Sequence, residues 1–124
     1  MPHLTLEYTT NLDKLEPGRT LLSLNEALVE SGHFNDTDIK SRAIALDTWC
    51  VGTAPSGHAF AHVKLAILSG RSPEVKSALS ASLLRVLRAS CPDAGGLAVQ
   101  LCVEVLDIDR ASYAKDILNA NDGR

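Results

Sequence analysis

The chain has 124 residues, of which 45% are hydrophobic and 4% aromatic, and its formal net charge is −3. This composition is typical of one ordinary globular domain and excludes disorder and collagen-like repeats. The acidic balance and the five aromatic residues argue against a nucleic-acid partner, because such a partner requires a basic face or a stacking platform.

No membrane partner or export signal is expected. The longest apolar stretch, residues 59–68, is interrupted by His62 and Lys64 and is too short to span a bilayer. The opening Met1-Pro2-His3 lacks the basic segment of an export signal, so we expect the cytoplasm. The cysteines have no CxxC or zinc-site spacing and are interpreted as free thiols: they are Cys50, Cys91 and Cys102.

The first half of the chain predicts a strand, a helix and a second strand. Residues 3–8 alternate in hydrophobicity, which indicates a half-buried strand, and Pro2 stands where its missing N–H costs least. After a turn through Pro17-Gly18, leucines recur at helical spacing until Gly32 provides a stop. The alternation returns over residues 42–51 and predicts the second strand.

The second half repeats this order. Residues 59–68 predict a third strand. A second helix then begins with Ser72 as its N-cap and Pro73 at its first position, and it must end by Pro92. Residues 97–105 alternate again and predict the fourth strand.

The order strand, helix, strand, repeated once, predicts two β-α-β halves inside one domain. The domain covers residues 1–124, with halves at about 2–52 and 58–106 and a polar tail over 107–124. By pattern alone this is an α/β arrangement. Right-handed crossovers place both helices on the same face of a four-stranded sheet.

Two helices leave the opposite face of the sheet uncovered. Small or mixed rather than charged residues are expected there, which favours contact with another copy of the chain. The alternative is a face in contact with water, as in many antiparallel sheets. The residues expected on this face are Ala43, Ala45, Trp49, Ala98, Gln100 and Cys102.

Pro2 is the main candidate for chemistry. An initiator methionine before a small residue is normally removed, so the mature chain would begin with a secondary amine. An α-amino group titrates near ~7.7 to 8.0, and partial desolvation or nearby cations lower that pKa. Such an amine could act as a base near neutral pH. The alternative is a Met-Pro start without any catalytic role, and the histidines show no metal-ligand spacing.

Three cations could accompany this amine. Lys40 and Arg42 precede the apolar part of the second strand, and Arg71 lies at the start of the second helix, where an anion is favoured. Parallel pairing of the first two strands would bring Lys40 and Arg42 toward Pro2, and an arginine can hold a carboxylate through two hydrogen bonds. Exposed solubilising charge is the alternative for each of them.

Five short motifs follow one another over the first two thirds of the chain. They are Pro2-His3 with Glu7 and Asn11, Lys40-Ser41-Arg42, Asp47-Thr48-Trp49, Ala59-Phe60-Ala61-His62 and Gly70-Arg71-Ser72. In order and spacing they resemble the 5-carboxymethyl-2-hydroxymuconate delta-isomerase family of the tautomerase superfamily.

This resemblance implies an α+β fold with a repeated β-α-β unit, a four-stranded mixed sheet and two helices on one face. It further implies a homotrimer without a cofactor, in which Pro2 is the acid-base residue. Family members convert a 2-hydroxy-dienoate polycarboxylate into its 2-oxo-enoate isomer during the breakdown of homoprotocatechuate, an aromatic catabolite. Arg71, Lys40 and Arg42 would bind substrate carboxylates and stabilise the dienolate, and Phe34 would join them in substrate binding.

The chain also departs from its relatives. Lys40 stands where they have an arginine, and a lysine cannot make the two-pronged contact of a guanidinium. Asp116 stands where an asparagine is common. Both positions are expected near an anionic substrate, so the departures concern the substrate rather than the reaction type. The alternatives are a tautomerase of another 2-oxo acid, a dehalogenase-like enzyme, and a non-catalytic trimeric binding protein of the same fold.

Overall fold

The computed structural model describes residues 1–119; residues 120–124, the end of the predicted tail, lie outside the described part. Short 3-10 turns cover Asp36–Asp38 and Arg110–Ser112, and the last strand extends into the predicted tail as far as Ile108. The helices and strands are β1 (His3–Thr9), α1 (Pro17–Glu30), β2 (Lys40–Leu46), β3 (His58–Leu68), α2 (Pro73–Ala89) and β4 (Ala98–Ile108).

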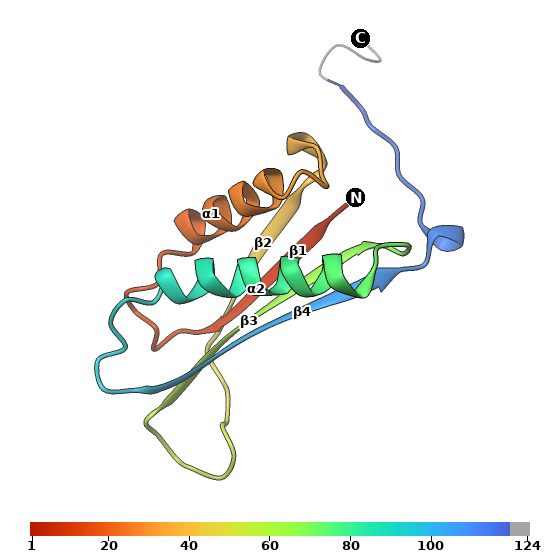
Figure 1. Cartoon of the computed structure of the whole chain (residues 1–124). Helices are drawn as coiled ribbons and strands as arrows, with labels where there is room; N and C mark the ends of the chain where they lie inside the picture. The colour runs from red at the N-terminus through yellow and green to blue at the C-terminus, as the bar shows by residue number, and fades with distance from the viewer. Residues whose placement is uncertain (120–124) are drawn as a thin grey trace.

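The four strands form one mixed sheet in the order β2-β1-β3-β4. β1 pairs with β2 in parallel and β3 with β4 in parallel, whereas the two central strands, β1 and β3, are antiparallel. Both helices lie across one face of this sheet (Figure 1). The predicted α+β fold, with a mixed sheet and two helices on one side, is therefore confirmed.

The core lies between the sheet and the helices. In β3 every second side chain, from Ala59 to Ile67, is fully or almost fully buried, and Leu4 and Leu6 of β1 continue this layer. From the helices, leucines at helical spacing complete the core: Leu24, Leu28, Leu79, Leu83 and Leu87. Burial of this apolar surface is the main force that holds the helices on the sheet.

The helix starts follow from their first residues. The Ser72 hydroxyl accepts a hydrogen bond of 3.2 Å from the Val75 amide, so the predicted N-cap of α2 is confirmed. In α1, however, Pro17 and Gly18 belong to the first helical turn rather than to a preceding turn. The fixed φ of a proline suits the first helical position, and its missing N–H would have no helical partner there. No helix within residues 1–119 is long and apolar enough to cross a membrane.

The second strand is shorter than predicted. It ends at Leu46 instead of continuing to residue 51, because its only neighbour, β1, ends at Thr9 and offers no further ladder partner. Trp49 therefore lies in the following loop, where its indole N–H donates to the carbonyl oxygen of His58 at 3.2 Å.

The uncovered face of the sheet differs in part from the expectation. The register pairs Leu6 with Ala43 and Tyr8 with Ala45, so both alanines lie on the helix side, and Ile44 lies on the open face instead. The side-chain alternation of a strand has two possible orientations, and only the pairing register decides between them.

The β4 side of the open face agrees better with the sequence. Ala98, Gln100 and Cys102 lie there as predicted. The face is also more charged than expected, since His62 Nε2 lies 2.6 Å from a carboxylate oxygen of Glu104.

Two neighbouring leucines of α2 test the position of the core. Leu83 is fully buried, whereas Leu84 is 40% exposed. Leu83→Ala is expected to lower the free energy of unfolding by about 2–5 kcal/mol because it leaves a cavity, and Leu84→Ala by less than about 1 kcal/mol. Urea unfolding of both variants measures the difference, and equal losses would contradict this packing.

Candidate active site

The strand directions bring the start of β1 and the start of α2 together. His3 pairs with Ala66 in the antiparallel β1–β3 ladder, so the end of β3 and the turn that follows it lie beside Pro2. β2 begins at the same edge, where the Lys40 amide donates to the Pro2 carbonyl oxygen at 3.1 Å. The predicted approach of Lys40 to Pro2 therefore occurs through the backbone of two parallel strands.

A hollow of about 280 Å³ opens at this place. It contains Pro2, Phe34 and Arg71, three of the five residues predicted for the site. Pro2 itself is almost fully buried, and Met1 precedes it in the lining of the hollow. The other lining residues are Gly32, His33, Asn35, Asp38 and Leu68.

Arg71 is held in place by the segment that follows α1. Its guanidinium donates to the carbonyl oxygen of His33 at 3.0 Å and to His33 Nδ1 at 3.3 Å, which requires the neutral ring with its proton on Nε2. The guanidinium carbon also lies 5.3 Å from the centre of the Phe34 ring, within cation–π range. Within residues 1–119 it forms no ion pair with a carboxylate, so its charge is free for an anionic ligand.

The N-terminal amine lies in a partly buried, positively charged setting. Burial lowers the pKa of the Met1 amine, and the charges of Lys40, Lys115 and Arg71 lower it further, while Asp38 raises it. Burial also lowers the pKa of Lys40, with Lys115 as the next cause. The Lys40 ammonium nitrogen is buried without a hydrogen-bond partner, so this edge of the sheet contains an unsatisfied cation.

Arg42 lies outside the hollow. One of its guanidinium nitrogens donates to His3 Nδ1 at 3.2 Å, so the proton of a neutral His3 ring is on Nε2, which donates to the Tyr113 hydroxyl at 2.9 Å. Burial and the charges of Lys40 and Arg42 lower the pKa of His3, which favours this neutral form. Arg42 thus contributes charge near the start of β1 but does not line the hollow.

Three residues of this site were not predicted from the sequence. His33 positions Arg71, Asp38 lines the hollow, and the Lys115 ammonium lies 3.0 Å from an Asp38 carboxylate oxygen. The sequence offered a signal for His33 and Asp38, which are close to Phe34 and Lys40 along the chain. Lys115 is next to Asp116, which was expected near an anionic substrate, but its contact with Asp38 spans 77 residues and no local pattern predicts it.

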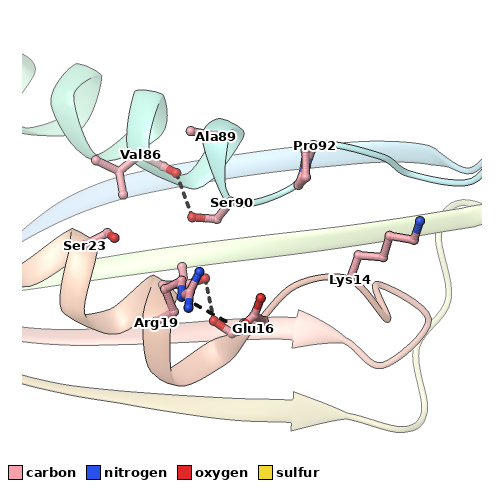
Figure 2. A pocket seen from close by; sticks show the side chains of 9 residues that line it. Lys14, Glu16, Arg19, Ser23, Val86, Ala89, Ser90 and Pro92 are labelled. Atoms are coloured by element: carbon pink, nitrogen blue, oxygen red, sulfur yellow. Dashed lines mark hydrogen bonds and ion pairs between the residues drawn. The ribbon is translucent and has the colours of Figure 1, made fainter.

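A second hollow, of about 470 Å³, lies between the start of α1 and the end of α2 (Figure 2). Most of its charged groups are paired: Arg19 lies 3.8 Å from Glu16, and Lys14 lies 3.2 Å from Asp93. The Ser90 hydroxyl donates to the Val86 carbonyl oxygen at 2.9 Å. It contains no free amine and no unpaired buried cation. Residues 1–119 also contain no group of three His, Cys, Asp or Glu side chains placed to bind a metal ion.

Solved structures with the same fold include two muconate isomerases. A 5-carboxymethyl-2-hydroxymuconate isomerase from Deinococcus radiodurans R1 is 33% identical, with a TM-score of 0.84 over 93% of this chain and 88% of that one. A 5-carboxymethyl-2-hydroxymuconate delta-isomerase is 22% identical, with a TM-score of 0.76 over 96% and 89%. A fused 4-OT wild-type symmetric trimer is 21% identical, with a TM-score of 0.66 over 96% and 92%.

A comparison with curated proteins finds no match. The family model of 5-carboxymethyl-2-hydroxymuconate isomerase, in contrast, matches residues 2–119, which is nearly the whole chain and includes Pro2 and Arg71. Together with the 33% identity to the Deinococcus protein, this match confirms the resemblance seen in the sequence. The chain belongs to the 5-carboxymethyl-2-hydroxymuconate isomerase family, a family of isomerases within the tautomerase superfamily.

Proposed function

We propose that the chain is a cytoplasmic, cofactor-free isomerase in which the Pro2 amine, freed by removal of Met1, moves a proton on a 2-hydroxy-dienoate polycarboxylate. The product is the 2-oxo-enoate isomer, and the proposed substrate is 5-carboxymethyl-2-hydroxymuconate from the breakdown of homoprotocatechuate. The observation that carries this proposal is the position of Pro2 and Arg71 in the lining of one hollow.

The setting of the amine supports its role as a base. When Met1 is removed, the amine belongs to Pro2, which is more deeply buried than Met1. We expect the burial and the cations that lower the pKa of the Met1 amine to act in the same direction on the Pro2 amine. A lowered amine pKa increases the fraction of unprotonated nitrogen near neutral pH, and the unprotonated amine is the form that can accept a proton.

The proposed proton transfer needs one acid-base residue and one fixed positive charge. Pro2 accepts the proton of the 2-hydroxyl group, which leaves a dienolate, and then returns a proton to the distal carbon of that dienolate. Arg71, already positioned by His33, binds a carboxylate and stabilises the negative charge as it develops. Lys40 adds a second positive charge, Arg42 a third near the start of β1, and Phe34 forms an apolar wall.

A homotrimer is part of the same proposal. The open face of the sheet carries exposed apolar side chains, among them Ile44 at 45% and Leu106 at 42% exposure. A second copy of the chain can cover such residues. One neighbour of the same fold is itself described as a symmetric trimer.

Replacement of the proposed base tests the reaction directly. Pro2→Ala should lower kcat for ketonisation of 5-carboxymethyl-2-hydroxymuconate by at least about 100-fold, since general acid-base catalysis typically contributes 10²–10⁴-fold. Ultraviolet absorbance follows the reaction, and intact mass verifies that Met1 is absent. The exposed proline of the loop after β2 serves as control in Pro55→Ala.

A chain extended ahead of Pro2 provides the complementary measurement, because an acylated nitrogen cannot accept a proton. Such a protein should fold normally and be as inactive as the Pro2 variant. Full activity in either protein would refute Pro2 as the base.

The charges around the amine predict opposite shifts of its pKa. Asp38 raises this pKa and Lys40 lowers it, so Asp38→Asn should lower the pKa of the Pro2 amine and Lys40→Met should raise it. Because catalysis needs the unprotonated amine, the rise of kcat/KM with pH should move to lower pH in the first variant and to higher pH in the second. A titration of the ¹⁵N-labelled amine by NMR checks the shifts without turnover, and shifts in the same direction would contradict the assigned geometry.

Two exposed leucines test the trimer. Leu106→Glu places a charge on the open face of the sheet, whereas Leu22→Glu places one on α1, where Leu22 is 61% exposed. Light scattering after gel filtration should give three times the 13.2 kDa chain for the parent protein and for Leu22→Glu, and a smaller species for Leu106→Glu. A monomeric parent protein would rule out the proposed assembly.

A further inference from the structure

The C-terminal segment returns to the hollow that contains Pro2. After β4 and the short 3-10 turn at 110–112, the Tyr113 hydroxyl accepts a hydrogen bond of 2.9 Å from His3. Two residues later the Lys115 ammonium lies 3.0 Å from a carboxylate oxygen of Asp38 and 3.1 Å from the Met1 sulfur. The Lys115 side chain is only 22% exposed although the segment around it is exposed, so the ammonium points toward the site.

Positive charge exceeds negative charge at this place. Lys40, Lys115 and Arg71 surround the amine, and among residues 1–119 Asp38 is the one carboxylate that lines the hollow. Lys115 is paired with Asp38, whereas the Lys40 nitrogen is buried without any partner. A buried ammonium without an acceptor is costly, and a ligand carboxylate would supply the missing acceptor.

Removal of Met1 changes the surroundings of Lys115. When Met1 is present, the ammonium donates to the Met1 sulfur, and this acceptor is lost when Met1 is removed. Lys115 then retains Asp38 as its acceptor and has a donor free on the side where the Pro2 amine becomes accessible, since an ammonium carries three N–H donors. Removal of Met1 thus exposes the proposed base and also frees an N–H donor of the Lys115 ammonium beside it.

We propose that Lys115, together with Lys40, binds a second carboxylate of the substrate, so that the C-terminal segment gives the site its preference for polycarboxylates. The inference rests on the proposed function, because it assigns the carboxylate contact to the same hollow in which Pro2 moves the proton. The His3–Tyr113 hydrogen bond holds the segment in place. In the alternative, Lys115 is only a latch that fixes the segment to Asp38 without contacting the substrate. The following test distinguishes the two roles.

Lys115→Met removes the charge and keeps the length of the side chain. It should lower kcat/KM for 5-carboxymethyl-2-hydroxymuconate at least about tenfold, the size expected for one hydrogen bond to a charged group. For the monocarboxylate phenylenolpyruvate it should change kcat/KM less than about threefold. Lys115→Arg, which keeps the charge, should retain most of the activity on the polycarboxylate.

Lys76→Met is the matched control. Lys76 forms an ion pair of 3.3 Å with Asp107, and its side chain is 28% exposed. Asp107 does not line the hollow, whereas Asp38, the partner of Lys115, does. This variant should leave both kcat/KM values unchanged. Equal losses on both substrates in Lys115→Met, or no loss on either, would overturn the inference and leave Lys115 as a latch.

Binding separates this inference from the proposed reaction. If the parent protein turns over neither acid, calorimetry with propane-1,2,3-tricarboxylate decides instead. Binding that weakens at least about tenfold in Lys115→Met but not in Lys76→Met supports the carboxylate site although the proposed reaction has failed. No binding to the parent protein, or equal binding to parent and Lys115→Met, overturns it.

Discussion

The antiparallel pairing of β1 with β3 determines where every residue of the candidate site lies. Each half of the chain begins with a strand and continues into a helix, so each half places a helix N-terminus at the end of its own first strand. Because β1 and β3 run in opposite directions, the turn before α2 lies beside the start of β1. A parallel arrangement of the same halves would separate Arg71 from Pro2 by the length of the sheet. The parallel partner β2 then adds Lys40 at the same edge.

The electrostatics of the site follow from this convergence. The chain as a whole carries a formal charge of −3, yet three cationic side chains lie around one amine and one aspartate. Partial burial makes these charges interact more strongly than they would in water, and burial together with the neighbouring cations lowers the pKa of the Met1 amine and of Lys40. The Lys40 ammonium is buried without a hydrogen-bond partner, so the packing of the core offsets the free-energy cost of burying this charge. An anionic ligand would remove that cost, which is the physical basis of the carboxylate preference that we propose for the site.

The two halves of the internal repeat have similar elements, but only one half carries the reactive groups. Arg19 occupies the start of α1 as Arg71 precedes α2, but Arg19 pairs with Glu16 whereas Arg71 has no acidic partner in the described chain. Gly57 precedes β3 as Pro2 precedes β1, and an internal glycine has no free amine. A chain terminus occurs once, so a mechanism that depends on a terminal amine belongs to one half of a repeated fold. The open face of the sheet takes no part in this chemistry, and the proposed trimer would bury it.

The sequence by itself determined the order of helices and strands, the N-cap at Ser72 and the family. It also identified Pro2 and Arg71 as candidate site residues. Local periodicity, capping chemistry and motif order are properties of neighbouring residues, and neighbouring residues are what a sequence displays. Tertiary structure alone decided which face Ala43 and Ala45 occupy, because strand alternation is the same in both orientations until a register is chosen. It alone placed His33 behind Arg71 and brought Lys115 to Asp38 across 77 residues. Such contacts depend on how the halves pack, and closeness along the chain to a predicted site residue does not define them.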